Sequence, residues 1–294
     1  MVQIRRFTCA KALEDGLKVV GFDVARQRRT CAATNIQRFR AAYGVGPGAC
    51  SAVYRDLQTT SVPDARINEP SSFYLLVALN WLSTYKKEAE MAGFFKCDDK
   101  TLRKHIKKYV NAIAALKEEM VVWDDGNDEM FLLSVDGVHF RINEPRTEPS
   151  SKWCSHKHKS AGLNYELGIS IYKNKIVWIK GPFKAATHDR TIFCTKGLAD
   201  KIPAGKKAVA DRGYTGEKCK DEKLSIRNPR DSDALRQFKR RVRARHENFN
   251  ARIKVFKILE ERFRHGVKRH KAVMEAVCVL VQYDMENGHP LVDV

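Results

Sequence analysis

The sequence predicts a mixed α/β body preceded by an all-helical region, and two patterns carry this prediction. Between residues 36 and 116, apolar residues recur every three or four positions, which is the period of an amphipathic helix. After residue 120, short apolar runs and alternating apolar and polar residues become common, which is typical of strands in a layered α/β fold. The 294 residues suffice for one large domain or two modest ones. The change of pattern near residue 121 predicts a domain boundary there.

The chain carries a large excess of positive charge, with 54 lysine and arginine residues against 35 aspartate and glutamate residues. Such basic proteins commonly bind polyanions, most often nucleic acid. Much of the excess falls in residues 232–271, where a plain solvated helix is the alternative explanation. No apolar run is long enough for a membrane helix or a secretory signal, so no membrane partner is expected. The widely spaced cysteines favour reduced thiols over a disulfide framework.

The first 120 residues are predicted to hold a basic arm and a helical DNA-binding domain. Residues 1–34 carry arginine clusters with weak periodicity, and we interpret them as a basic N-terminal arm. Within residues 35–120, helices are expected at 36–43 and 49–58, separated by a segment rich in glycine and proline. Ser71 or Ser72 can cap an apolar helix that follows.

A helix-turn-helix is predicted at the end of this domain. A short helix at 88–95 is followed by a polar turn, and Asp98 or Asp99 can cap a second helix that runs to Leu116. One face of this second helix is apolar. Its opposite face carries four basic residues, Lys100, Arg103, Lys104 and Lys107. These four are predicted to contact DNA, and ordinary surface charge is the alternative.

Residues 121–294 form the predicted α/β body. The apolar run 130–135 predicts a buried strand that ends at Asp136, and a half-buried strand is expected at 138–142. A hairpin is expected over 167–179, and residues 208–210 predict a second short buried strand that ends at Asp211. Beyond residue 232 a basic helix and a final apolar helix, about 271–286, are expected.

Three acidic residues are candidates for a metal site: Asp136 and Asp211 at the two strand ends, and Glu247 on the basic helix. If the two strands are parallel neighbours, both aspartates emerge at one edge of the sheet. Close carboxylates repel each other, a divalent cation relieves the repulsion, and oxygen ligands suit Mg²⁺ or Mn²⁺. The alternatives are turn chemistry for each aspartate and an ion pair with Arg243 for Glu247.

The basic helix would hold the phosphate backbone beside such a site. Three of its residues are predicted to bind DNA, namely Arg240, Arg243 and Lys254.

The sequences around the three acids resemble the blocks of a DDE transposase, in its Harbinger/IS5-like branch. The blocks are Val135-Asp136-Gly137, Ala210-Asp211-Arg212-Gly213-Tyr214 and the stretch Arg245 to Lys254. Segments 152–157 and 181–189 add to the resemblance, which covers about residues 120–290 and, more loosely, 36–118. It implies an RNase H-like fold in which the strands of the first two acids lie side by side. It also implies an Mg²⁺-dependent nuclease that cuts transposon ends and joins the freed 3′-OH to target DNA.

In this resemblance the catalytic, metal-binding carboxylates fall on Asp136, Asp211 and Glu247. Residues 185–187 depart from it, because relatives often carry a Gly-Ser pair there. Asp189 is interpreted as a helix cap, the alternative being a residue that supports the site. Cys154, His156 and His158 alternate, as in a basic strand that faces DNA, and a metal site is the alternative.

The resulting hypothesis is a DDE transposase whose partner is double-stranded DNA, both the transposon ends and the target. One alternative is a host DNA-binding protein that kept the fold after losing activity, although binding alone does not need three carboxylates in a positive groove. Another is a nuclease without strand transfer. A homo-oligomer and an accessory DNA-binding protein are left open. The family branch favours a eukaryotic, nuclear protein, and a bacterial one would be cytoplasmic.

Overall fold

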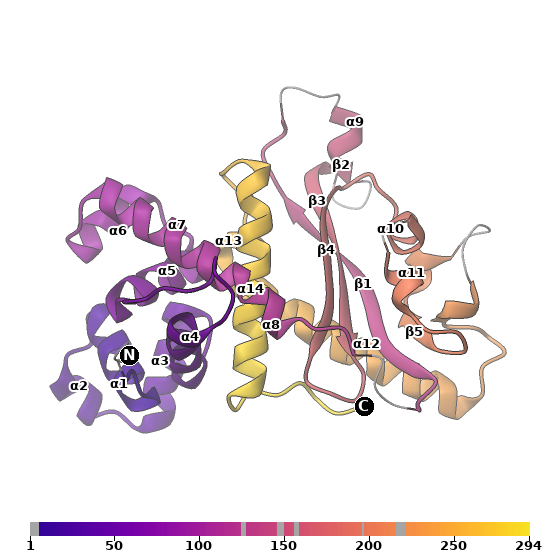
Figure 1. Ribbon diagram of the computed structural model, residues 1–294, viewed down its shortest axis with the longest axis horizontal. Helices are drawn as coiled ribbons and strands as arrows, with labels where there is room; N and C mark the ends of the chain where they lie inside the picture. The colour runs from indigo at the N-terminus through magenta and orange to yellow at the C-terminus, as the bar shows by residue number, and fades with distance from the viewer. Residues whose placement is uncertain (1–5, 125–127, 146–149, 156–158, 196, 216–220) are drawn as a thin grey trace. The chain divides into compact units, whose positions relative to one another are not determined.

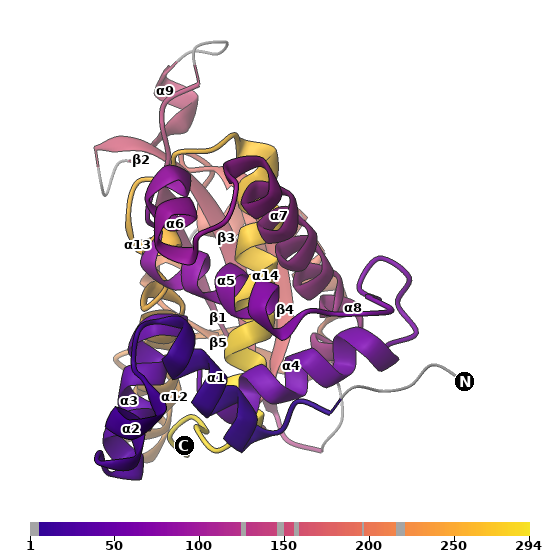
Figure 2. The same ribbon diagram turned by 90° about the vertical axis from the view of Figure 1, so that its left-hand side faces the viewer.

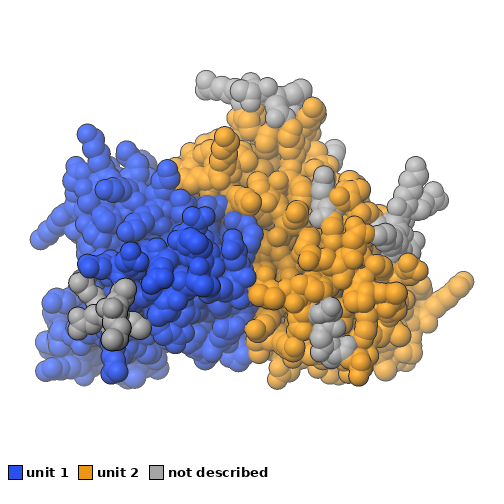
Figure 3. All heavy atoms as spheres, viewed as in Figure 1, with its two compact units in different colours: residues 1–120, 253–261, 272–290 blue, residues 121–252, 262–271, 291–294 orange. Residues whose placement is uncertain are grey.

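The computed structural model describes residues 6–124, 128–145, 150–155, 159–195, 197–215 and 221–294 (Figure 1). These residues form two compact units, shown in two colours in Figure 3. Unit 1 comprises the described residues up to Met120 together with Ile253–Glu261 and Ala272–Pro290. Unit 2 comprises the described residues of Val121–Arg252, Arg262–Lys271 and Leu291–Val294. The division after Met120 was expected, but the assignment of two C-terminal segments to unit 1 was not.

Unit 1 is helical, as the apolar period predicts (Figure 2). Its helices are α1 (Cys9–Val19), α2 (Val24–Arg28), α3 (Ala32–Tyr43), α4 (Pro47–Thr59), α5 (Ser72–Thr84), α6 (Glu88–Phe95), α7 (Asp99–Ala115), α8 (Lys117–Met120), α13 (Lys257–Glu260) and most of α14 (Val267–Glu286). Helix α5 packs against α3, α7 and α13. It is buried along most of its length because its sequence is apolar on every side. Ser71 caps it, as expected.

The prediction of a basic arm over residues 1–34 is wrong for the part of that segment that the structure describes. Residues 9–28 form α1 and α2, and α1 packs against α3 and α4. The buried face of α1 is made of Ala12, Gly16 and Leu17. Small residues give a weak hydrophobic pattern, but here they allow close packing. A methyl group on Gly16 would lie 2.3 Å from the Phe39 ring.

Unit 2 contains a mixed sheet flanked by helices, so the predicted α/β class is confirmed. Its strands are β1 (Phe131–Arg141), β2 (Cys154–Ser155), β3 (Ser160–Ser170), β4 (Ile176–Lys184), β5 (Lys207–Ala210) and β6 (Leu224–Ile226). The order is β2-β3-β1-β5-β6, with β4 also paired to β3. Strands β4, β3 and β1 are antiparallel, and β1, β5 and β6 are parallel.

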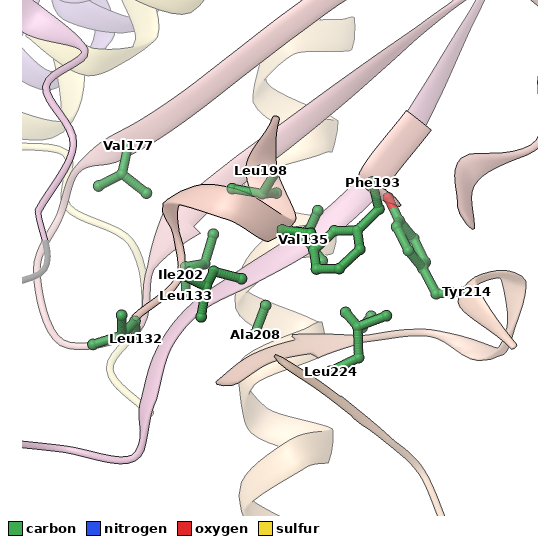
Figure 4. Close-up of a cluster of buried hydrophobic side chains, with 12 residues drawn as sticks. Leu132, Leu133, Val135, Val177, Phe193, Leu198, Ile202, Ala208, Tyr214 and Leu224 are labelled. Carbon is green, nitrogen blue, oxygen red and sulfur yellow. The ribbon is translucent and has the colours of Figure 1, made fainter. Parts of the chain in front are cut away.

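Helices cover both faces of this sheet. On one face, Leu133 and Val135 of β1 pack against Phe193 of α10 (Asp189–Thr195) and Leu198 of α11 (Leu198–Lys201) (Figure 4). On the other face, β5 packs against the long helix α12 (Asp233–Lys254) through Val209 and other apolar residues. The side chains of a strand alternate between its faces, so Ser134 and Asp136 point toward the α12 side. Short helical turns complete the unit: α9 (Ser150–Trp153), η1 (Arg212–Tyr214) and η2 (Asp221–Lys223).

Two further expectations need correction. Asp136 does not end a strand, because β1 continues through it to Arg141, paired with β3 along the way. The two strands predicted at 130–142 are therefore one. Cys194 takes part in a disulfide bond, so the expectation of reduced thiols throughout is wrong at that residue. Among the described helices, none is both long and apolar enough to cross a membrane.

Candidate active site

Asp136 lies on β1 and Asp211 directly follows β5, the parallel neighbour of β1, as the family resemblance implies. The last pair that joins β1 to β5 is Ser134 with Val209, and each aspartate follows two residues later along its own strand direction. A step of two residues keeps a side chain on the same face, so both carboxylates lie on the α12 side beyond the end of β5. Because β5 ends at Ala210 while β1 continues, the two aspartates lie where their strands separate.

Hydrogen bonds hold both carboxylates in place. Asp136 Oδ2 accepts from Asn250 Nδ2 of α12 at 3.0 Å, and Asp136 Oδ1 accepts from the backbone N–H of Gly137 at 2.9 Å. Asp211 Oδ1 accepts from the backbone N–H of Gly213 at 2.7 Å and so caps the short helix η1. The turn chemistry considered for Asp211 is therefore present, and it orients the carboxylate as well as ending the strand.

The site concentrates negative charge in a half-buried place. Burial first, and then the negative charges of Asp211 and Asp189, raise the pKa of Asp136 to about 6. The hydrogen bonds from Gly137 and Asn250 lower this pKa but do not cancel the rise. Carboxylates that raise each other's pKa by repulsion in this way are typical of a site that binds a cation.

Asp189 joins this group, so its interpretation as a helix cap is wrong. The His188 ring Nδ1 accepts from the backbone N–H of Arg190 at 3.3 Å, which places His188 in the capping role. Asp189 Oδ1 instead accepts from Asn164 Nδ2 of β3 at 2.7 Å. A methyl group on Gly137 would lie 2.3 Å from Asp189 Oδ1, so this carboxylate lies against the backbone next to Asp136.

Glu166 and Tyr214 lie behind the aspartates, and neither is among the residues predicted from the sequence. Glu166 is 1% exposed on β3, and its Oε2 accepts from Trp178 Nε1 at 3.0 Å. Burial raises the pKa of Glu166 to about 8, against the effect of the Trp178 bond. The available signal was that Glu166 is the single charged residue of β3. Burial and the nearby carboxylates, Glu166 first, raise the pKa of Tyr214 well above its ordinary value.

Glu247 is exposed on α12 and is not brought against the aspartates. It borders a pocket of about 640 Å³ whose lining is mostly basic, from Arg227, Arg236, Lys239, Arg240 and Arg243. Asn250, which contacts Asp136, lies three residues later, on the same face of the helix. The alternative ion pair between Glu247 and Arg243 does not form among the described side chains.

The predicted DNA-binding residues fall in both units. Arg240 and Arg243 line the pocket of unit 2, and Lys254 is exposed at the end of α12. In unit 1, Asp98 caps α7 through the N–H groups of Lys100 and Thr101, as expected. The four basic residues of α7, Lys100, Arg103, Lys104 and Lys107, are exposed. Arg103 forms an ion pair of 2.6 Å with Glu88 of α6.

The donor atoms at the aspartates suit a hard divalent cation. Carboxylate oxygens are the ligands that Mg²⁺ and Mn²⁺ prefer, and buried amide oxygens of Asn164 and Asn250 have no hydrogen-bond partner among the described residues. No three His, Cys, Asp or Glu side chains in the described part of the chain are arranged closely enough to hold an ion. For the alternative at residues 154–158, only Cys154 and Ser155 are described, and His156 and His158 lie outside the described residues.

Comparison with known proteins identifies the family to which the chain belongs. Residues 135–282 match a family model described as DDE superfamily endonuclease, and this match spans half of the chain. The chain therefore belongs to the DDE superfamily endonuclease family. It is also 27% identical over 163 residues to a protein of Microchaete diplosiphon named "Probable transposase for insertion sequence element IS702". That similarity covers 52% of this chain and 57% of the relative. No solved structure matches.

Proposed function

We propose that this protein is a DDE transposase that cuts DNA at the ends of a mobile element and joins the freed 3′-OH to target DNA. The observation that carries the proposal is the placement of Asp136 on β1 and of Asp211 directly after β5, its parallel neighbour, inside the family match. The strand order, three antiparallel strands followed by two parallel ones, supports an RNase H-like fold. A nuclear location stays a prediction from the family branch.

In this proposal Asp136, Asp211 and Glu247 hold Mg²⁺ or Mn²⁺. A bound ion of this kind activates the attacking oxygen and stabilises the leaving oxygen in phosphodiester cleavage. The chain's own residues prepare the site: Asn250 and the N–H of Gly137 fix the orientation of Asp136, and the N–H of Gly213 fixes Asp211. Glu247 reaches the same site from α12 when its side chain turns toward Asn250.

DNA would bind to two basic surfaces. The pocket of α12 borders Glu247, so arginines there can hold the phosphates that flank the cut. Helices α6 and α7 are joined by a three-residue turn and the second helix is capped, which supports a helix-turn-helix whose helix α7 would enter the major groove. Arg103 would exchange Glu88 for DNA on binding, whereas Lys100, Lys104 and Lys107 are exposed beforehand.

Binding and cleavage are tested in parallel on three amide variants, Asp136→Asn, Asp211→Asn and Glu247→Gln. The substrate is a supercoiled plasmid that carries the DNA flanking the gene on both sides, where the proposal expects inverted repeats. Each variant should bind this DNA at least as well as the wild type, because less negative charge faces the phosphates. Each should lose Mg²⁺- or Mn²⁺-dependent nicking, because a metal ligand is removed.

The matched control is Asp128→Asn, which removes an exposed carboxylate before β1. It should nick the plasmid as the wild type does. Wild-type nicking by any one of the three amide variants removes that residue from the site. A wild type that binds the repeats but never cuts with either metal would favour the host DNA-binding alternative, and cutting without joining would favour a nuclease.

A further inference from the structure

The short helix α2 and its surroundings carry arginines to which the proposed function gives no role. They lie on α2, in the turn after it and on α3, and they are Arg26, Arg28, Arg29 and Arg38. The first three are exposed and the fourth is half-buried. None of the four pairs with a carboxylate among the described residues. Arg40 on α3 differs from them, because it forms an ion pair of 2.8 Å with the buried Asp284.

Acidic residues are scarce in this part of the chain. Asp23 is the single acidic residue between residues 16 and 55. Its carboxylate caps α2, because Asp23 Oδ1 accepts from the backbone N–H of Arg26 at 2.7 Å. The positive charge around α2 is therefore not balanced locally. Like charges held close together repel each other, and an anionic partner relieves this repulsion.

An aromatic ring holds two of these arginines in place. Phe22 lies in the loop before α2, and its ring centroid is 4.9 Å from Arg26 Cζ and 4.8 Å from Arg38 Cζ. Arg38 Nη1 also donates to Thr30 Oγ1 at 3.1 Å. A guanidinium that already rests on an aromatic ring loses less freedom when it binds an anion, so these contacts prepare the two side chains for binding.

Buried amide side chains fix the turn between α2 and α3. Gln27 is 9% exposed and Asn35 is 7% exposed. Gln27 Nε2 donates to the carbonyl oxygens of Phe22 at 2.8 Å and of Glu14 at 3.1 Å, which joins α2 to α1. Asn35 Nδ2 donates to the carbonyl oxygen of Gln27 at 2.9 Å, which joins α3 to α2. The exposed arginines of the turn are therefore carried by a backbone whose position is fixed from inside.

The surface next to the turn leaves room for a large partner. The exposed residues at the start of α3 are uncharged, and two of them are small: Ala32, Ala33, Ile36 and Gln37. A partner can therefore approach α3 closely while the arginines beside it bind its charges. Because the arginines are spread over two helices and a turn, they suit an extended polyanion with many phosphates better than a single small anion.

We propose that the α2–α3 surface, defined by Arg26, Arg28, Arg29 and Arg38, binds the phosphate backbone of double-stranded DNA. The inference rests on the proposed function, which supplies duplex DNA as the polyanion, and it adds a contact to those of α7 and α12. The planar fork of an arginine matches the oxygens of a phosphate. Phosphate contacts carry no base information, so this surface should act on any DNA sequence. The competing explanation is a set of solvated charges that bind nothing.

The test measures binding of the full chain to a labelled duplex of random sequence, by fluorescence anisotropy at several salt concentrations. The first variant combines Arg28→Gln with Arg29→Gln, both exposed, so its stability in urea should match the wild type. Its affinity at about 0.15 M salt should fall roughly fivefold for each phosphate contact that is lost. The slope of log affinity against log salt should change by about 0.9 for each such contact.

The matched control combines Arg55→Gln with Arg66→Gln. It removes two exposed charges from the end of α4 and from the loop after it, away from α2 (Figure 2). Its affinity should stay within about twofold of the wild type, because salt screens distant charges. If the control weakens binding as much as the first variant does, the effect comes from net charge alone and the inference is wrong.

The second variant combines Arg26→Gln with Arg38→Gln, and it should weaken binding and flatten the salt dependence in the same way. Wild-type affinity and slope in both variants overturn the inference, and so does a loss of binding to duplex RNA but not to duplex DNA. The proposed function survives these outcomes if the wild type still nicks the plasmid. A wild type that binds no duplex DNA overturns both.

Discussion

The basic residues of α7 and those of α12 look alike in the sequence but have different surroundings in the structure. On α7 all four predicted DNA contacts are exposed. On α12, Arg245 is 2% exposed and donates to the carbonyl oxygens of Lys173 and Val292, and Lys239 is 5% exposed and pairs with Asp231. Part of the positive charge of residues 232–271 is therefore used inside the protein. Net charge alone does not separate cations that hold the fold from cations that are free to bind a polyanion.

The largest effect should come from a buried cation. Arg245→Met removes the donor to two backbone carbonyls and to Asn174 Oδ1, leaving three part-buried acceptors without this donor. The free energy of unfolding should fall by about 3–5 kcal/mol. Urea denaturation of the full chain measures it, with Arg243→Met as the matched control two residues earlier. Equal stability of the two variants would show that burial does not distinguish these arginines.

Asp136, a half-buried carboxylate, should show the opposite effect on stability. Asp136 has a pKa raised to about 6 in the folded chain against an ordinary 3.8, so the folded chain holds a proton that the unfolded chain releases between these pH values. The stability that this proton confers is lost as the pH rises through about 6. In EDTA near pH 7, Asp136→Asn should therefore raise the free energy of unfolding by on the order of 2–3 kcal/mol. The gain should shrink toward zero near pH 4, and a gain that is the same at both pH values would contradict the raised pKa.

The exposed face of α7 should affect binding and not stability. Replacing Arg103 and Lys104 by alanine should weaken binding to the inverted repeats roughly tenfold if one of them makes a bidentate hydrogen bond to a base. Gel-shift titration at constant salt measures this change, and urea denaturation checks that stability is kept. Glu88→Gln is the variant to compare, because it releases Arg103 from its ion pair and should tighten binding to the DNA. Unchanged binding by the double variant would reject the helix-turn-helix proposal.

The smallest effect should be a change in the salt dependence of DNA binding. Neutralising Arg240, Arg243 and Lys254 should flatten the dependence of log affinity on log salt, on any DNA sequence. The slope should change by about 0.9 for each phosphate that the variant no longer neutralises. The measurement is fluorescence anisotropy of a labelled duplex at several salt concentrations. If the triple variant keeps the wild-type slope, these three residues are ordinary solvated charges and do not bind phosphates.

The sequence predicts the parts of the fold that depend on apolar runs. The residues before Asp136 and Asp211 are largely apolar, which is why their burial could be expected from the sequence, whereas the parallel pairing of the two strands was implied only by the family resemblance. The cap at Asp98 was also predictable, because capping depends on local spacing alone. Helix α1 was missed because Ala12 and Gly16, which make most of its buried face, carry little hydrophobic signal.

The parts of the site that depend on contacts across the sheet could not be predicted in the same way. Asp189 occurs at the start of a helix, where an acidic residue is usually a cap, and only its hydrogen bond to Asn164 on β3 reveals another role. The burial of Glu166 depends on Trp178 of the neighbouring strand. Glu247 is exposed on α12, and no local pattern in the sequence determines how far it lies from the aspartates.

The bond between Asn250 and Asp136 also limits how this sequence can change. This hydrogen bond fixes the rotation of α12 about its own axis. Glu247 lies three residues before Asn250, on the same face of the helix. One inserted or deleted residue between the two would rotate one of them by about 100° around the helix. Homologues that cut DNA should therefore keep this interval without gaps, while the number of residues between Asp136 and Asp211 is free to vary.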